Sequence, residues 1–273
     1  MALADWLDLL AQPFVWRALA VGVMVAVCAA LLGVVLVMKG YAMIGHGLAD
    51  VGFAALSIAV AFNLPPLAVS MPIVVAASFI IMAVCQNKNI QGDVAIGATA
   101  TAALAIGVIV TATTRGFNID VYNFMFGSIL TMTIGDVWLS AALAVTVAGL
   151  YILFYNRIFL ITCDEEFART TGINVPLYRF LISFLTAVTI VAGMRMMGTL
   201  LISSLIIFPA ITARKLAGGF KSLVVIAVVI SVCCFIIGFV LSAGFNLPTG
   251  AGIAASSIVL MALVTAIQSL KRS

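Results

Sequence analysis

A histidine and an aspartate stand one helical turn apart within a strongly apolar stretch of the chain. The segment YAMIGHGLADVGFA at 41–54 holds His46, the only histidine of the protein, and Asp50 four residues later. Residues i and i+4 of an α-helix share one face, with Cβ atoms about 5–6 Å apart. An imidazole nitrogen and a carboxylate oxygen at this spacing are ligand types for zinc, manganese or ferrous iron. The spacing therefore predicts a binding point for a divalent cation.

The same two residues allow two other interpretations. A buried His–Asp hydrogen bond could serve only to lock helix packing, or the pair could relay protons. An aspartate within a membrane span costs about 2.5–3.5 kcal/mol on insertion scales, so it usually faces a bundle interior or a water-filled path. That cost favours metal passage, and the other two interpretations stay open.

Two ligands do not complete a metal site, because zinc prefers four. A symmetric dimer with both copies of this helix at its axis would supply two imidazoles and two carboxylates, and closed two-fold assembly is the usual form of homo-oligomers. Some methionines could add soft ligands, although methionine at helical spacing more often packs. They are Met43, one turn before His46, and the cluster Met194, Met196 and Met197.

The elements that position this pair must be membrane helices. The 273 residues are 65% hydrophobic and only 8% charged, with a mean hydropathy of +1.32. The apolar runs are continuous, which indicates an all-α polytopic membrane protein and not a β-barrel with alternating residues. The net charge of +4 is explained by basic cytoplasmic loops, so it requires no nucleic-acid partner. The five scattered cysteines form neither a disulfide framework nor a zinc motif.

The apolar runs predict eight or nine transmembrane helices. The segment 197–213 is the weakest candidate, because it is short and ends near Pro209. If all nine cross and the loop 156–175 is cytoplasmic, most of the 13 lysines and arginines lie inside, which places the N-terminus outside. Residues 1–14 are expected to form an interfacial segment, and 15–273 a single transmembrane domain. The candidate spans are 15–38, 41–62, 66–86, 93–114, 136–155, 176–194, 197–213, 222–243 and 249–269.

The cytoplasmic loop 156–175 is the most charged stretch of the chain. Asp164 is a suitable N-cap, Glu165 and Glu166 suit the positive end of a helix dipole, and Gly172 is a suitable C-cap. These residues predict a short helix that docks a partner, with an ordinary solvated loop as the alternative. The nearest approach to a phosphate-binding loop is GGFKS at 218–222, which lacks the required spacing. Any ATP hydrolysis therefore requires a separate subunit.

Six short motifs occur in order along residues 15–269. They are MKGYAMIGHGLADVGFA, GDVAIG, FNIDVYNFMFGSIL, CDEEFARTTGI, MMGTLLISSLIIFPAITARKLA and FNLPTGAGI. In this order and spacing the chain resembles the membrane permease subunit of the zinc/manganese/iron ABC transporter family, often called the ABC-3 family. The family usually carries a GD-x-x-x-H pattern, whereas this sequence has the same pair in reversed order as His46 and Asp50.

The resemblance implies a type II ABC importer-like permease in a prokaryotic cytoplasmic membrane, without a permanently bound cofactor. It implies a homodimer, an extracytoplasmic solute-binding protein that delivers the metal, and an ATPase that docks on 164–172. The cargo would be a divalent metal, with zinc favoured by the imidazole ligand, and manganese or iron next. The alternatives are an ATP-independent secondary transporter or channel, and the same scaffold carrying a siderophore or cobalamin. The expected ATPase-coupling residues are Asp164, Glu165, Glu166, Phe167, Ala168, Arg169 and Gly172.

Overall fold

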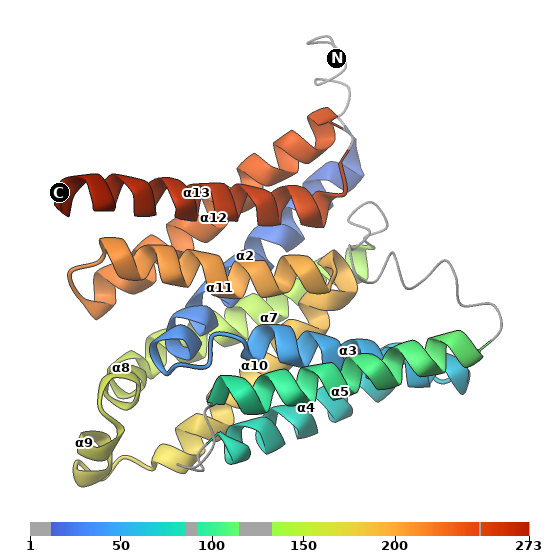
Figure 1. Ribbon diagram of the computed structural model, residues 1–273, viewed down its shortest axis with the longest axis horizontal. Helices are drawn as coiled ribbons and strands as arrows, with labels where there is room; N and C mark the ends of the chain where they lie inside the picture. Colours follow the sequence, from blue (N-terminus) through green and yellow to red (C-terminus); the bar gives the residue numbers. More distant parts are fainter. Residues whose placement is uncertain (1–11, 86–91, 115–132, 246, 273) are drawn as a thin grey trace.

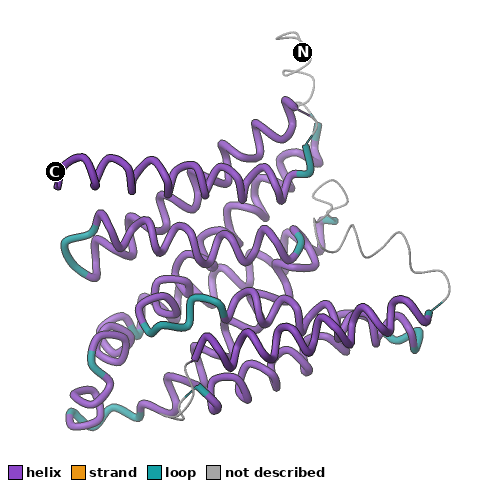
Figure 2. The backbone as a smooth tube through the Cα atoms, in the orientation of Figure 1, coloured by secondary structure: helices purple, strands orange, loops and turns teal. Residues whose placement is uncertain are grey.

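Within the described residues, the fold consists of helices joined by short connections (Figure 2). The computed structural model describes residues 12–85, 92–114, 133–245 and 247–272, and within these ranges it contains helices and no strand. This confirms the predicted all-α architecture. Most of the N-terminal interfacial segment predicted at 1–14 lies outside the described residues.

Nine helices within the described ranges are long and apolar enough to cross a membrane, which is the upper of the two predicted counts. Pro209 lies inside α11, which continues past it as one helix, so the predicted weak segment is a full span. The nine helices are α2 (Pro13–Met38), α3 (Ile44–Ala61), α4 (Pro66–Val84), α5 (Gly92–Thr113), α7 (Ile134–Leu153), α10 (Val175–Met197), α11 (Thr199–Leu216), α12 (Phe220–Phe245) and α13 (Thr249–Arg272).

Four of these helices form the centre of the bundle. Most residues of α2, α3, α10 and α11 are buried, whereas few residues of α4, α5, α7 and α13 are. Two short helices, α8 (Tyr155–Cys163) and α9 (Glu165–Thr170), project at the end of the bundle where α13 finishes, and α2 begins at the opposite end (Figure 1). The outer helices therefore present apolar surface to lipid or to another chain.

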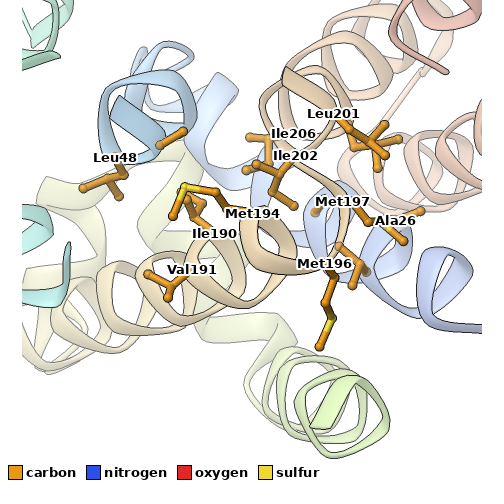
Figure 3. Packing of buried hydrophobic residues seen from close by; sticks show 14 of the residues in the cluster. Ala26, Leu48, Ile190, Val191, Met194, Met196, Met197, Leu201, Ile202 and Ile206 are labelled. Atoms are coloured by element: carbon orange, nitrogen blue, oxygen red, sulfur yellow. The ribbon is translucent and has the colours of Figure 1, made fainter. Parts of the chain in front are cut away.

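The central helices approach one another closely where side chains are small. A Cβ added to Gly33 of α2 would lie 2.2 Å from the carbonyl oxygen of Ile206 on α11, so only glycine permits this crossing. Around it, Leu48, Ile190 and Ile202 pack in one buried cluster that joins α3, α10 and α11 (Figure 3). This cluster holds α3 in place.

Candidate functional site

The predicted pair comes together on α3. His46 Nε2 lies 3.7 Å from Asp50 Oδ2, and both residues lie in the first two turns of the helix. Both side chains therefore occupy one face, as the i, i+4 spacing predicts. The 3.7 Å separation is longer than a hydrogen bond, so the nitrogen and oxygen are not fully committed to each other.

Glycines on both sides of His46 fix the rotation of α3 in the bundle. An added Cβ would lie 3.2 Å from Ile206 Cδ1 of α11 at Gly45, and 2.7 Å from Ile96 Cγ2 of α5 at Gly47. Two residues beyond Asp50, a Cβ added at Gly52 would lie 2.3 Å from the terminal methyl of Met194 on α10. Because α3 is packed this closely against three helices, the direction of its remaining face is determined by the fold.

That remaining face opens outward at His46. The His46 side chain is 54% exposed, although it lies within an apolar span, whereas the Asp50 side chain is only 14% exposed. An ionisable side chain on a lipid-facing surface is energetically unfavourable, so such residues usually face protein or a water-filled path. Within the described residues, no group of three or more His, Cys, Asp or Glu side chains is placed to hold a metal ion. One chain therefore offers two candidate ligands and an open side.

The methionine cluster does not extend this site. Met194, Met196 and Met197 are 1%, 4% and 0% exposed and belong to the central apolar cluster (Figure 3). The Met196 sulfur also accepts a hydrogen bond of 3.2 Å from the Ser140 hydroxyl. The cluster therefore acts in packing, which was the more common expectation for methionine. Met43, one turn before His46, is 42% exposed and is the one of these four that remains accessible.

The predicted short helix in the charged loop is present as α9. The Asp164 carboxylate accepts a hydrogen bond of 2.9 Å from the backbone N–H of Phe167, so Asp164 is the N-cap. At the other end, Gly172 has φ +79°, and the N–H groups of Gly172 and Ile173 donate to the carbonyls of Arg169 and Ala168. This is the Schellman termination that glycine favours, and it confirms Gly172 as the residue that ends the helix.

The inner side of helix α9 packs against α8 and α10. Ala168 is fully buried in a small apolar cluster with Ile161 of α8 and with Val175 and Tyr178 of α10. Residues 156–163, expected to be part of a loop, instead form most of α8. Its signal is the buried row Ile158, Ile161 and Thr162 at helical spacing.

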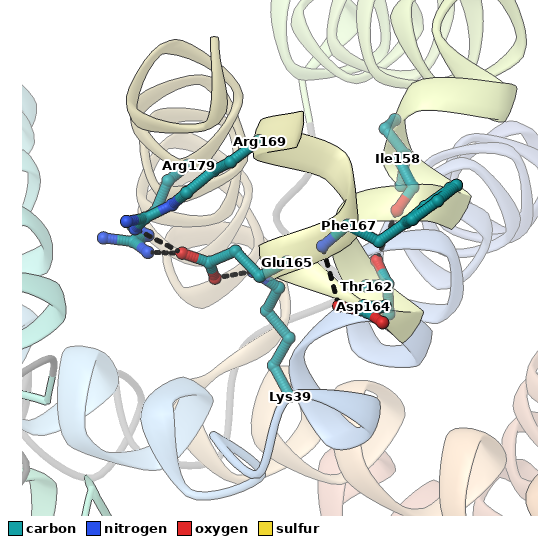
Figure 4. A network of polar contacts seen from close by, with 8 residues as sticks. All are labelled: Lys39, Ile158, Thr162, Asp164, Glu165, Phe167, Arg169 and Arg179. Carbon is teal, nitrogen blue, oxygen red and sulfur yellow. Dashed lines mark hydrogen bonds and ion pairs between the residues drawn. The ribbon is translucent and has the colours of Figure 1, made fainter. Parts of the chain in front are cut away.

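Glu165 joins α9 to the transmembrane helices. Its carboxylate lies 3.1 Å from Lys39 Nζ at the end of α2 and 3.0 Å from an Arg169 guanidinium nitrogen, and it also pairs with Arg179 of α10 (Figure 4). No local pattern in the sequence brings Lys39 or Arg179 to Glu165, so these two contacts could not be predicted from it. Two residues from outside α9, Lys39 and Arg179, thus help to hold the predicted docking helix in place.

The electrostatics of this network favour ionised groups. Burial raises the pKa of Glu165, but the hydrogen bond and charge of Lys39, together with Arg179 and Arg169, lower it below its ordinary value. Burial lowers the pKa of Lys39, and the two arginines add to this effect, while Glu165 opposes it. The carboxylate therefore remains ionised and keeps three cations together.

The other predicted coupling residues lie on the outer side of α9. Phe167 is 54% exposed, although large aromatic side chains are usually buried. Glu166 and Arg169 are also exposed. Helix α9 therefore presents an aromatic side chain beside charged groups, on a base fixed by Ala168 and Glu165. This arrangement fits the docking of another protein.

Comparisons with known proteins agree with this architecture. The family model described as ABC 3 transport family matches residues 11–268. The manganese transport system membrane protein MntC of Halalkalibacterium halodurans is 27% identical over 256 residues, covering 94% of this chain and 88% of that protein. The high-affinity zinc uptake system membrane protein ZnuB of Haemophilus influenzae is 28% identical over 246 residues, covering 90% of this chain and 94% of that protein.

A solved structure shares the fold. PsaBC from Streptococcus pneumoniae in complex with Fab superposes with a TM-score of 0.83 at 23% identity, covering 96% of this chain and 95% of the matched chain. This likeness, together with the nine spans of the described residues, confirms the predicted permease fold class.

Proposed function

The chain belongs to the ABC 3 transport family, and we propose that it is the permease subunit that passes a divalent transition-metal ion through the plasma membrane. It is a multi-pass membrane protein. Residues 15–273 form the single permease domain of this proposal. The observation that supports it most directly is the outward-open His46 beside Asp50 on one face of a membrane helix.

We propose that a second copy of the chain completes the metal path. Two ligands per chain are half of the four that zinc prefers, and the His46 side chain is exposed at the outer surface of the bundle. Beside it, α5 exposes a row of small residues, and no atom lies within 4 Å of a Cβ added at Gly97. Small residues allow two membrane helices to approach closely. The exposed small residues of α5 are Gly97, Ala98, Thr101, Ala102 and Ala105.

In such a dimer the two copies of His46 and Asp50 would face each other across the two-fold axis. Two imidazoles and two carboxylates would then provide four ligands, the number that zinc prefers. The chain would hold no permanent cofactor, because the metal would be cargo that binds and leaves.

The energy for transport would come from a partner. The chain itself acts as a transport subunit without catalytic residues, and an ABC ATPase would dock on residues 164–172, with Phe167 as the apolar contact. The support for this docking is the exposed Phe167 on a capped helix whose buried side is anchored. A solute-binding protein would deliver the metal on the opposite side of the membrane.

Zinc is the proposed main cargo, followed by manganese and iron. The support is the imidazole of His46, since nitrogen ligands suit zinc while manganese prefers oxygen. The named relatives include both a manganese and a zinc transport protein, so cargo choice within the metal class requires a direct measurement.

The test is the total metal content of cells with and without this gene, by mass spectrometry, under separate zinc and manganese limitation. A selective fall in zinc supports the proposal in full. A fall in manganese or iron alone supports the importer and overturns zinc as the cargo. Unchanged metal content under each limitation would overturn the proposed function.

A further inference from the structure

A cavity of about 260 Å³ opens beside the docking helix, between α4, α9 and α10. Its lining includes two arginines, Arg169 of α9 and Arg179 of α10, and the rings of Phe79 of α4 and Phe180 of α10. The Ser183 hydroxyl, which also lines it, donates to the carbonyl of Ser78 and so ties α10 to α4. The helices that line the cavity are therefore tied together. One side of the cavity is cationic and the other is aromatic.

The cationic side carries more positive charge than the protein neutralises. Lys39, Arg169 and Arg179 all pair with the single carboxylate of Glu165, which leaves two positive charges in excess among these four groups. A guanidinium has five N–H donors in a planar fork that matches phosphate oxygens. Arg169 is 60% exposed, so most of its donors remain available. The charge and the donor geometry fit a phosphate group.

The aromatic side continues along the outside of α10. The rings of Phe79 and Phe180 stack with centroids 4.4 Å apart and an angle of 6°, and Phe184 follows at 6.5 Å and 4°. Phe180 and Phe184 are 54% and 40% exposed, and both lie within the membrane span of α10. An acyl chain could lie along these exposed rings while its headgroup contacts the arginines.

We propose that this cavity binds an anionic phospholipid, with its phosphate on Arg169 and Arg179 and an acyl chain along Phe180 and Phe184. An acidic segment of a soluble partner could reach the arginines. It would not account for an aromatic surface that continues into the span, where lipid is the surrounding solvent. Because Arg169 belongs to α9, the bound lipid contacts the same helix that carries Phe167.

The test is lipid titration of the purified, delipidated full-length protein in detergent, followed by native mass spectrometry. Dioleoylphosphatidylglycerol and dioleoylphosphatidylcholine are the two probes. Both lipids carry a phosphate, but the choline cation of the second offsets its charge, so the wild type should bind the anionic lipid about tenfold more tightly. Arg169→Gln should remove this preference. Phe180→Ala should weaken binding of both lipids, since the acyl contact is lost without a change of charge.

Arg214→Gln is the matched control, because Arg214 is an exposed arginine at the end of α11, outside the cavity. It should keep the wild-type preference, and thermal unfolding of each variant checks that the fold is intact. An equal preference in the wild type and Arg169→Gln overturns the proposal. Displacement of the lipid by inorganic phosphate at equal concentration also overturns it, in favour of a free-anion site. So does weakened binding of the ATPase subunit by Arg169→Gln with unchanged lipid binding, in favour of a protein contact.

Discussion

Lys39 Nζ lies 3.1 Å from Glu165 Oε2, although 126 residues separate the two in the chain. The contact joins the end of α2, one of the most buried helices of the bundle, to the short helix α9. Both side chains are largely enclosed, with 13% and 29% exposed. A force applied to α9 would therefore be transmitted to the centre of the bundle through this pair.

Replacing Glu165 should destabilise the protein. Glu165→Gln leaves the enclosed ammonium of Lys39 and the guanidinium of Arg179 without their carboxylate, which should lower the free energy of unfolding by about 1–3 kcal/mol. The measurement is thermal unfolding of the purified protein in detergent. Glu166→Gln is the matched control, because Glu166 is the exposed neighbouring glutamate. Equal unfolding temperatures for the two variants would contradict a structural role for the network.

The same pair of proteins, wild type and Glu165→Gln, should show a defined pH dependence. The pKa of Glu165 is lowered below its ordinary 4.5 by Lys39 and the arginines. A carboxyl with a lowered pKa contributes its full stability above the ordinary value and loses it as the pH falls through the lowered one. The difference in unfolding temperature should therefore persist from neutral pH down to the ordinary glutamate range and vanish only below it. A difference that disappears well above that range would show that another group titrates.

Close packing of α2 on α11 should make Gly33 intolerant of a side chain. The Cβ of Gly33→Ala would lie 2.2 Å from a backbone oxygen of Ile206, so the two helices must separate. Overpacking of this kind costs typically about 1–3 kcal/mol, visible as a lower unfolding temperature. Gly149→Ala is the control, since nothing lies within 4 Å of its added Cβ. It should be neutral or stabilising, because alanine favours helix over glycine. Similar effects at both positions would contradict the crossing.

The membrane spans could be predicted from the sequence because apolar run length is a local property. Helix α9 could be predicted as well, because its cap residues Asp164 and Gly172 act on backbone groups within a few positions. The pairing of Lys39 with Glu165 could not, since only the packing of α2 brings the lysine to α9. The outward direction of His46 likewise depends on the glycine contacts of α3 with three other helices, which no local pattern reveals.

Phe167 should be needed for ATPase docking and not for folding. It is 54% exposed, so Phe167→Ala should leave the unfolding temperature nearly unchanged. Loss of a central aromatic contact should weaken binding of the proposed ATPase subunit by at least about tenfold, as for an interface hot spot. Phe62→Ala is the control, because Phe62 is an exposed phenylalanine (73%) outside the cytoplasmic loop. Retention of ATPase binding and of coupled transport in Phe167→Ala would place the docking contact elsewhere.

The metal pair on α3 gives a prediction about uptake. His46→Ala and Asp50→Ala should each reduce metal uptake by at least about tenfold, since the loss of even an outer-shell partner costs a metal site roughly 10–100-fold in affinity. Asp93→Asn is the control, because Asp93 is an exposed first-turn residue of α5 outside the pair. Uptake of isotopically labelled zinc and manganese into vesicles is the measurement. Wild-type uptake by either alanine variant would remove the pair from the metal path.

Exchanging the two residues tests whether their order matters. His46→Asp combined with Asp50→His keeps an imidazole and a carboxylate one turn apart on the same face, so uptake should be retained. Position 46 is open while position 50 is 14% exposed, so the larger imidazole must fit the more enclosed position. The single variant His46→Asp, which has two carboxylates and no imidazole, should lose zinc uptake more than manganese uptake, because manganese prefers oxygen ligands. Complete loss of uptake in the double variant, with normal unfolding, would show that the surroundings of α3 require histidine at the exposed position 46 and aspartate at the enclosed position 50.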